Sequence, residues 1–376
     1  MRTAGVLAGA LLIAAALASA PARSPTRRAA QALQPTATAA AASGRRRDRL
    51  RFGIYPWGSA GCAGKCAPAV AENADRSMAA VLQLGRGHPF VVHLFGDYDG
   101  VSDASVDSLV REASWWSAAG MQIAAVLRYR PADAGSVAGY PAWVRTQARR
   151  LAALSSTVSI QIANEPNNKA SGAGDGSYPG VLDAIAAAVP AARSEVVAAG
   201  RPDILIGFNW AAGLHPAITE PMWSQLRRSG GRAFSHAVGF VAVSVYPGVW
   251  TPRASTSGRP ASRIARTIRR TLGALRNRHM TAAGVGKASI VIGEAGYPTT
   301  AARTEVTQKK VLRAIVTVVD QTKASYGVTD LYWFGLRDGN TASGRLEDGY
   351  GLLRDDYSAK PAFRTLQRLV ARPGHA

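Results

Sequence analysis

The chain contains little cysteine and few acidic residues, and it lacks several motifs that mark common enzyme classes. Only 2 of its 376 residues are Cys, and its 24 Asp and Glu are outnumbered by 45 Lys and Arg. No His-Glu-x-x-His motif and no pair of Cys-x-x-Cys motifs is present, so we expect neither a catalytic metal nor a cofactor. The absence of a Gly-x-Ser-x-Gly elbow argues against a serine hydrolase of that type. No complete phosphate-binding loop is present either.

The N-terminus has the features of a secretion signal. Residues 1–22 begin with the positive charge of Arg2, continue without charge and end in small residues suited to cleavage. An uncleaved membrane anchor over the same residues is the alternative. Residues 23–49 are rich in Ala, Pro and Arg, so we expect a disordered linker. No later apolar stretch is long enough to span a membrane, and we therefore predict a secreted protein whose folded domain covers residues 50–376.

The two cysteines fit an exported protein. Cys62 and Cys66 lie four residues apart in a Gly-rich stretch. In an oxidising compartment such a pair predicts a local disulfide that closes a short loop.

The net charge of +21 is unusually high, and the basic residues are mostly arginine, 38 against 7 lysines. One interpretation is attraction to anionic cell-wall polymers. The other is that arginine reflects the base composition of the genome, because the charges after residue 50 look scattered and form no recognised motif. Since no nucleic-acid-binding motif accompanies them, we expect no nucleic-acid partner.

Eight short apolar runs with β-forming residues follow the linker. They lie at 51–56, 90–95, 121–127, 158–163, 203–208, 239–245, 288–293 and 329–334. The runs are apolar at both odd and even positions, as expected for strands that are covered on both faces. Ala-rich or amphipathic segments follow them, at 68–84, 104–119, 140–154, 178–198, 218–229, 259–279, 302–324 and 360–371. Eight strand–helix units predict an α/β fold, the (β/α)8 TIM barrel. A doubly wound open sheet is the alternative, although it normally has fewer units or a glycine-rich first turn.

Two of the runs are followed closely by a glutamate. Asn164-Glu165-Pro166 directly follows the fourth run, and Glu294 directly follows the seventh. In a TIM barrel the carboxyl ends of the strands form the active site, so the two side chains are expected at one mouth. A Glu at the end of a buried strand is costly to desolvate and is rarely there for packing. Two carboxyl groups are what the cleavage of a glycosidic bond requires.

With these motifs the chain resembles clan A of the retaining glycoside hydrolases. In that clan the acid/base Glu ends strand 4, usually within Asn-Glu-Pro, and the nucleophile Glu ends strand 7. The segment 293–299 is similar to the nucleophile segment of family 17, whereas Asn164-Glu165-Pro166 is more like family 5, so the subfamily and the linkage stay open. The resemblance covers residues 50–371 and implies Glu165 as acid/base and Glu294 as nucleophile. We then expect a raised pKa for Glu165 and an ionised Glu294.

Six further residues are predicted to bind substrate. The resemblance implies that Asn164 bonds the sugar 2-hydroxyl, that Tyr246 orients the nucleophile and that Trp333 is the aromatic platform under the cleaved sugar. A sugar cleft needs both polar groups and flat aromatic faces. Three more candidates at strand ends are His93, Trp210 and Trp57.

Each of these predictions has an alternative. Either Glu could instead form a structural ion pair with Arg128 or Arg130, and the aromatic residues could belong to the core. The whole domain could also be a catalytically inactive cell-wall or carbohydrate-binding barrel with a basic surface. The sequence favours a secreted glycosidase that cleaves a β-linked polysaccharide or oligosaccharide with retention.

Overall fold

The computed structural model describes residues 49–58, 70–100, 104–131, 136–170, 172–214, 216–250 and 260–372. The predicted signal peptide, almost all of the predicted linker, and the cysteines Cys62 and Cys66 lie outside these ranges. Within them, no helix is both long and apolar enough to cross a bilayer.

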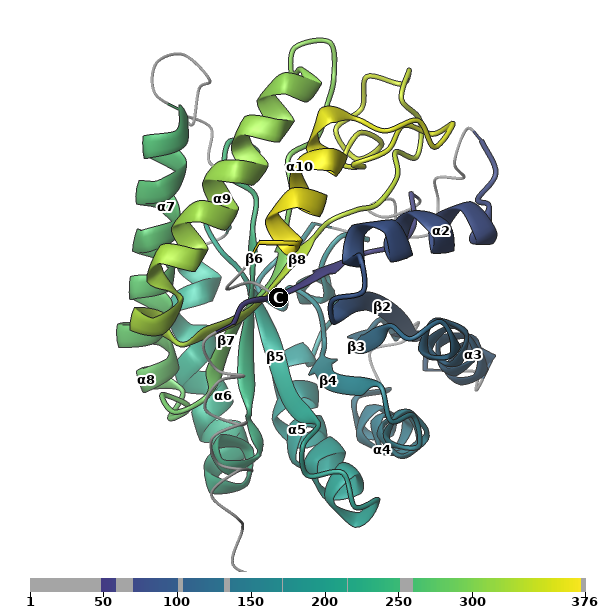
Figure 1. Cartoon of the computed structure of the whole chain (residues 1–376). Coiled ribbons are helices and arrows are strands. Elements are labelled where there is room, and N and C mark those ends of the chain that lie inside the picture. Colours follow the sequence, from purple (N-terminus) through teal and green to yellow (C-terminus); the bar gives the residue numbers. More distant parts are fainter. Residues whose placement is uncertain are drawn as a thin grey trace, which may run out of the picture. The chain divides into compact units, whose positions relative to one another are not determined.

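Eight parallel strands close into a barrel, in which each strand pairs with the next along the chain and β8 pairs with β1. The strands are β1 (Arg51–Ile54), β2 (Phe90–Tyr98), β3 (Gln122–Tyr129), β4 (Thr157–Ile162), β5 (Leu205–Ala211), β6 (Phe240–Val245), β7 (Ser289–Ala295) and β8 (Val328–Trp333). Figure 1 shows them inside a ring of helices. Each predicted run overlaps one strand, so the (β/α)8 TIM barrel is confirmed and the open sheet is wrong.

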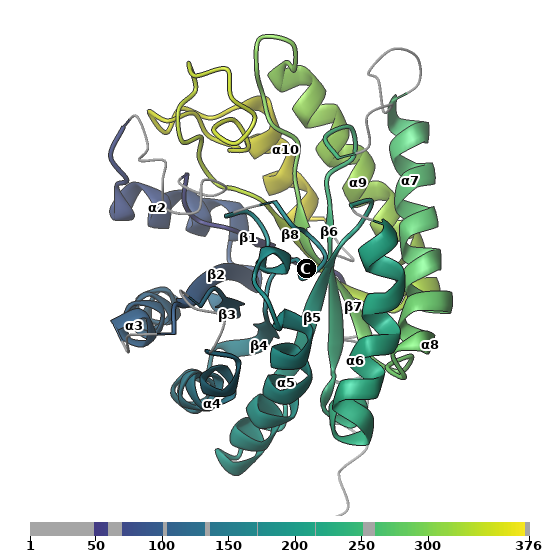
Figure 2. The ribbon, with the colours of Figure 1, turned by 180° about the vertical axis from the view of Figure 1, so that it is seen from behind.

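Helices follow the strands and cover the outside of the barrel, as the view from behind also shows (Figure 2). They are α2 (Ala74–Gly85), α3 (Ala104–Ala118), α4 (Gly139–Ala152), α5 (Val181–Ala198), α6 (Pro216–Ala237), α7 (Pro260–Ala274), α8 (Met280–Ala282), α9 (Glu305–Tyr326) and α10 (Pro361–Val370). Short turns of 3-10 helix, η1 (Ser136–Ala138) and η2 (Asp175–Ser177), precede α4 and α5, and the π-helical η3 (Leu275–His279) joins α7 to α8. The helix predicted at 218–229 begins two residues earlier in the structure, and Gly231, with a non-helical φ of 56° that suits glycine, separates it from a second helical stretch that ends at Ala237.

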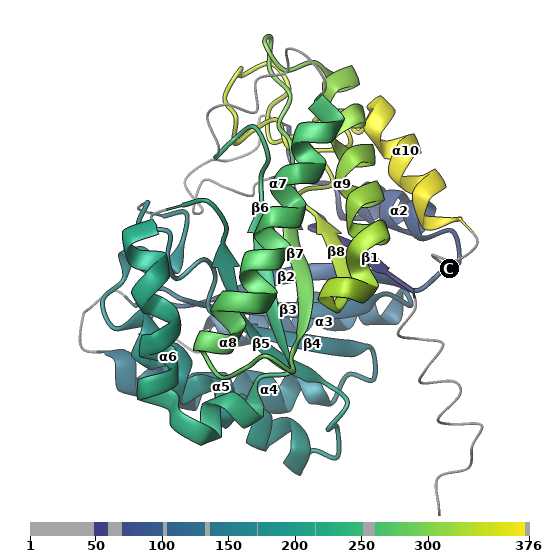
Figure 3. The same ribbon diagram turned by 90° about the vertical axis from the view of Figure 1, so that its left-hand side faces the viewer.

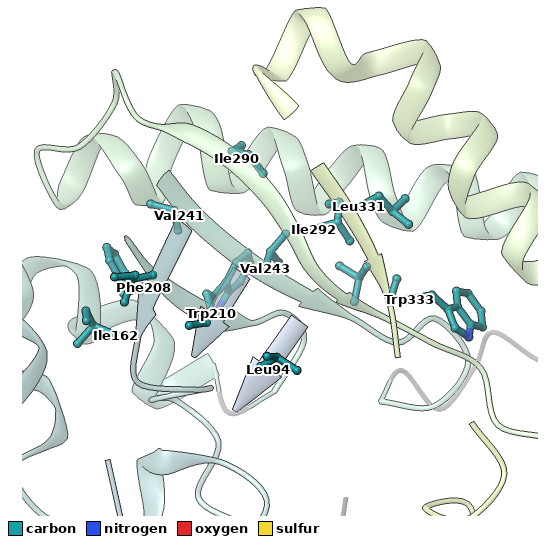
Figure 4. Packing of buried hydrophobic residues seen from close by; sticks show 14 of the residues in the cluster. Leu94, Ile162, Phe208, Trp210, Val241, Val243, Ile290, Ile292, Leu331 and Trp333 are labelled. Carbon is teal, nitrogen blue, oxygen red and sulfur yellow. The ribbon is translucent and has the colours of Figure 1, made fainter. Parts of the chain in front are cut away.

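The main apolar core lies between the strands and the helices. Outward-facing strand residues such as Ile162, Phe208 and Ile292 are completely buried there, and Figure 4 shows them within one cluster. This arrangement explains the apolar runs in the sequence, since strands of a parallel barrel are covered on both faces.

The inside of the barrel is more polar than the outer core. Its small apolar cluster consists of Val91, Ala124, Phe240, Ala242, Val291 and Tyr332. At the amino-terminal end of the barrel, Asp330 accepts hydrogen bonds from Arg51 Nε at 2.7 Å and from the Tyr332 hydroxyl at 3.0 Å. Inward and outward side chains alternate along each strand, so the inward residues nearest the carboxyl ends face the mouth of the barrel.

Candidate active site

The backbone turns sharply where β4 ends. Ala163 and Glu165 have φ values of 61° and 50°, in the left-handed region that residues other than glycine seldom adopt. Such backbone conformations cost about 1–3 kcal/mol each and persist only where their surroundings hold them. Here the N–H of Asn164 donates to Asp175 Oδ2 at 2.7 Å, and the N–H of Glu165 donates to Asn209 Oδ1 at 2.6 Å. The strained turn fixes the start of the Glu165 side chain.

The Glu165 carboxyl group is held from neighbouring strands and from its own loop. Asn168 Nδ2 donates to Glu165 Oε2 at 2.8 Å, and the Ser244 hydroxyl also hydrogen-bonds this carboxyl group. Asn209, whose side chain already receives the Glu165 N–H, donates from Nδ2 to Ser244 Oγ at 2.9 Å. A ring of hydrogen bonds therefore joins the backbone and the carboxyl group of Glu165 through β5 and β6.

An irregularity in β7 directs Glu294 to the same mouth. The register of β6 with β7 shifts after Val243, so that Ser244 pairs with Glu294 and Gly293 is the extra residue. The register of β7 with β8 shifts in the same place, between Ile292 and Ala295. A β-bulge of this kind bends its strand and redirects a side chain. Strict alternation from Ile292, which faces outward, would have sent Glu294 into the outer core.

Two groups donate hydrogen bonds to the Glu294 carboxyl group. The Tyr246 hydroxyl donates to Oε2 at 2.6 Å, and the side-chain amide of Asn164 donates as well. Gln161 Nε2 donates to Asn164 Oδ1 at 3.2 Å, which leaves the amide N–H groups of Asn164 as the donors toward Glu294. The structure thus brings together Asn164, Glu165, Tyr246 and Glu294, as the sequence predicts.

Both carboxyl groups have raised pKa values because both are buried, with exposures of 4% for Glu165 and 5% for Glu294. Burial raises the pKa of Glu165 to about 7, although the hydrogen bond from Asn168 opposes the change. Burial, and next the negative charge of Glu165, raise the pKa of Glu294 to about 8. The raised pKa of Glu165 agrees with the expectation, and the ionised form expected for Glu294 stays a prediction. The two groups titrate as a coupled pair that retains a proton near neutral pH.

Arg128 and Arg130 do not pair with these glutamates. Arg128 Nε lies 3.3 Å from Asp97 and 3.9 Å from Asp175, and Arg130 Nε lies 3.5 Å from Asp175. Within the described ranges neither Glu165 nor Glu294 forms an ion pair. The alternative of structural ion pairs is therefore wrong, and Asp97 and Asp175 take that role.

The aromatic platform predicted at Trp333 is wrong. Trp333 is 1% exposed and belongs to the outer core (Figure 4), because it follows the inward-facing Tyr332 on β8 and must point the other way. The next residue, Phe334, is partly exposed. Its ring centre lies 5.4 Å from that of Tyr55 and 6.1 Å from that of Tyr246, the partner of Glu294. Phe334 is thus one of three partly exposed aromatic residues around Tyr246, together with Trp250 at 4.4 Å and Tyr350 at 5.5 Å between ring centres.

Trp210 is also a core residue. Its ring lies 5.9 Å from Trp223 of α6 and 4.9 Å from His279 of η3, within the outer cluster of Figure 4. The cause is again alternation along the strand, because Asn209 on β5 faces inward. The prediction of a sugar contact at Trp210 is therefore wrong.

His93 and Trp57 lie in other surroundings. His93 is 3% exposed inside the barrel, with its ring 5.2 Å from Tyr332, and burial lowers its pKa to about 3, so the imidazole is neutral. Trp57 stacks on Trp115 of α3 at 6.4 Å and donates from its indole to Glu112 at 2.5 Å. Neither residue is among the hydrogen-bond partners of the carboxyl pair, and their contacts with substrate stay predictions.

Several residues of the site were not predicted from the sequence. They are Asn168, Asp175, Asn209, Ser244 and Phe334. Two of them carried a signal: Ser244 is a polar residue within an apolar run, and Asn209 directly follows one, both at inward positions near the carboxyl end of a strand. Asp175 carried none, because it reaches Asn164 only after the intervening loop folds back.

Comparisons with known proteins give a likeness of fold. No family model and no curated protein matches the sequence. A family 39 glycoside hydrolase from Bacteroides cellulosilyticus WH2 aligns with a TM-score of 0.57 and 15% identity over 86% of this chain and 64% of that chain. A GH5_18 structure from Streptomyces cattleya, in complex with GlcNAc, aligns with a TM-score of 0.59 and 17% identity over 86% and 80% of the two chains.

A structure of fungal β-1,4-galactanases aligns with a TM-score of 0.55 and 15% identity, over 85% of this chain and 99% of that chain. At such identities the likeness establishes the barrel fold and nothing finer, because this fold carries many functions. The neighbours named here are nevertheless all enzymes of carbohydrate chemistry.

Proposed function

We propose that this protein is a secreted glycoside hydrolase that cleaves a β-linked polysaccharide with retention of configuration. The observation that carries the proposal is the carboxyl pair Glu165 and Glu294, which stand at the ends of β4 and β7. Their charges interact, because ionised Glu165 raises the pKa of Glu294. A coupled pair that keeps one proton supplies an acid and a carboxylate in the same site. The fold of the structural neighbours agrees with this chemistry.

In the first half of the proposed reaction, the Glu294 carboxylate attacks the anomeric carbon. The bond from that carbon to the leaving oxygen breaks, and Glu165 donates its proton to this oxygen. In the second half a water molecule attacks the anomeric carbon, Glu165 takes its proton, and the Glu294 carboxylate leaves. Two inversions return the original configuration.

The surroundings of the pair suit these roles. Tyr246 binds one oxygen of Glu294, which leaves Oε1 for the anomeric carbon. The bulge in β7 and the strained turn after β4 hold the two carboxyl groups without help from the substrate, and preorganisation of this kind is what such catalysis requires. The ring of Phe334 offers an apolar face for the C–H face of a sugar.

The first experiment measures reducing-sugar release by the mature chain. The panel contains β-1,3-, β-1,4- and β-1,6-glucans, mannans, xylans and galactans, and Glu294→Gln is the control because it keeps the shape of the side chain. We expect release from one class of polymer and none above background from the variant. If the folded wild-type protein releases no reducing sugar from any polymer, the proposal is contradicted and the carbohydrate-binding barrel is favoured.

Tyr246→Phe tests the hydrogen bond to Glu294. A hydrogen bond to a charged group contributes about 1.5–3 kcal/mol, so we expect kcat to fall by about 10- to 100-fold while KM changes little. Tyr326→Phe, at the C-terminal end of α9, is the matched control and should behave as the wild type, because Tyr326 is partly buried but does not contact either carboxyl group. A Tyr246→Phe enzyme with full kcat would show that the hydroxyl does not act through the nucleophile.

A further inference from the structure

The positive charge of the folded domain comes almost entirely from one part of the chain. Residues 216–326 contain 17 Lys and Arg against 4 Asp and Glu. Residues 50–215 contain 13 of each kind, and residues 327–376 contain 7 basic and 6 acidic residues. These charges form no recognised motif in the sequence, but most of them fall on a few neighbouring elements of the fold.

The basic part of the chain forms one side of the barrel wall. It comprises α6, α7 and α9 together with β6 and β7. Figure 3 looks onto this side and shows α7 and α9 next to each other, with α6 beyond the lower end of α7. The packing of α7 on α9, and of α6 on α8, agrees with this view. Charges from three helices therefore share one wall.

The basic side chains of this wall face solvent. Arg227, Arg228, Arg232, Arg266, Arg270, Lys310 and Arg313 are exposed, and Lys309 is partly exposed. Within the described ranges none of these eight residues forms an ion pair. We call them the basic face.

The acidic residues of the same segment are already engaged. Glu220 pairs with Arg278, Asp320 pairs with Lys323, and Glu305 pairs with Arg354 at 2.8 Å. The fourth, Glu294, lies in the candidate active site. No acidic side chain of residues 216–326 is therefore left to neutralise the basic face.

On the opposite side of the barrel, the surface arginines of α4 form ion pairs. On α4, Arg145 and Arg149 both pair with Glu195, and Arg150 pairs with Asp107 at 2.5 Å. Ion pairs therefore neutralise these three arginines of α4, whereas the eight residues of the basic face have no acidic partner within the described ranges.

We propose that the basic face binds an acidic polysaccharide, a polymer that carries a carboxylate on many of its sugar units. Arginine suits this partner, because its planar guanidinium can bind a carboxylate through two hydrogen bonds. Several unpaired charges on one wall favour a ligand with repeated negative charges. This surface is separate from the mouth of the barrel, so it goes beyond the proposed hydrolase and does not depend on it.

Two other polyanions fit the surface less well. A membrane-binding helix inserts large apolar side chains, yet Val306 is the one exposed large hydrophobic residue in the described parts of α6, α7 and α9. Single-stranded nucleic acids need exposed aromatic rings for base stacking, and no aromatic residue is fully exposed in the described parts of these helices. A basic surface that lacks both exposed apolar side chains for a membrane and exposed aromatic rings for bases favours an acidic glycan.

The test compares two variants that lose the same charge. The first replaces four residues of the basic face: Arg266→Gln, Arg270→Gln, Lys310→Gln and Arg313→Gln. The matched control replaces four exposed arginines on α3 and α4: Arg111→Gln, Arg145→Gln, Arg149→Gln and Arg150→Gln. Both carry Glu294→Gln, so cleavage cannot alter the measurement, and both must show the thermal unfolding of a folded barrel.

Binding to polygalacturonate is measured by titration calorimetry in dilute buffer and again at about 0.5 M salt, where charge interactions are screened within a few ångströms. We expect binding that salt abolishes, a loss of about tenfold or more in affinity for the variant of the basic face, and a loss of under about threefold for the control. A neutral β-1,3-glucan should bind equally to both variants.

Three results would overturn the proposal. The first is no binding of polygalacturonate by the parent protein. The second is an equal loss of affinity in both variants, which would mean that net charge alone decides. The third is tighter binding to duplex DNA or to vesicles of an anionic phospholipid than to polygalacturonate, which would assign the face to that partner.

Discussion

Glu294→Ala should lower turnover by a factor of about 10³ or more, and azide should restore part of it, with a glycosyl azide of inverted, α configuration as product. Removal of the side chain takes away the proposed nucleophile and leaves space beside Tyr246 and Asn164. Azide can enter that space and attack the anomeric carbon directly, in a single inversion. The experiment uses a β-aryl glycoside of the sugar identified on the polymer panel, and NMR of the product gives its anomeric configuration.

Glu165→Ala is the counterpart that separates the two roles. It removes the proposed acid, so a substrate with a good leaving group should still transfer its sugar to Glu294, and hydrolysis of that intermediate should become slow. Azide then attacks the intermediate, and the product is the β-glycosyl azide. If both variants give the same anomer, or if azide rescues neither, the assignment of acid and nucleophile is wrong.

The strands of this fold were predictable for a physical reason. In a parallel barrel each strand is buried on both faces, so a run such as 239–245 is apolar throughout and stands out between polar turns. Helix lengths were less predictable. The predicted helix stops at residue 229, before Gly230 and Gly231, and the backbone is non-helical at Gly231, but a second helical stretch follows directly and ends at Ala237.

The two catalytic candidates were also predictable, because a Glu at the end of a buried strand is rarely explained by packing. The aromatic candidates were not. Trp210 and Trp333 end their strands, yet each follows an inward residue, and alternation sends both indoles into the outer core. The alternation of inward and outward side chains along β5 and β8 would have selected Asn209 and Phe334 as the residues that face the mouth. The bulge in β7 shows the limit of such counting, because only the paired strands reveal that Gly293 is an extra residue.

What the sequence could not give is the set of contacts made by segments far apart in the chain. Asp175 lies beside Asn164 and receives the N–H of Tyr129 at 2.8 Å, and both contacts depend on how a loop folds back. The basic face depends in the same way on which helices become neighbours. The excess of positive charge in residues 216–326 is already visible in the sequence, but which of these charges share a surface depends on the places of α6, α7 and α9 in the ring.

The burial that prepares the carboxyl pair for catalysis should also destabilise the protein at high pH. Both groups have an ordinary pKa of 4.5, and burial raises it to about 7 for Glu165 and about 8 for Glu294. Between these limits the folded protein holds protons that the unfolded chain releases, so the free energy of unfolding falls as the pH rises from about 4.5 to about 8. Below this window both groups are protonated in the folded and the unfolded protein, so they do not lower the free energy of unfolding. Above it both are ionised in the folded protein, and the burial of two charges lowers the free energy of unfolding to the full extent.

The double variant Glu165→Gln, Glu294→Gln should therefore melt at a higher temperature than the wild type at pH 8, and the advantage should shrink toward pH 5. Each pKa unit corresponds to about 1.4 kcal/mol, and each kcal/mol to about 2 °C in a large domain, so we expect a gain of several degrees. Glu220→Gln, an exposed carboxylate, is the control and should follow the wild type. Burial of Asp175 raises its pKa too, and its charge contributes to the raised pKa of Glu165, so the comparison measures the carboxyl pair together with this interaction. If the difference in melting temperature between the double variant and the wild type stays the same from pH 5 to pH 8, the pair does not hold its proton in the folded protein. Glu165 would then lack the raised pKa that an acid catalyst needs.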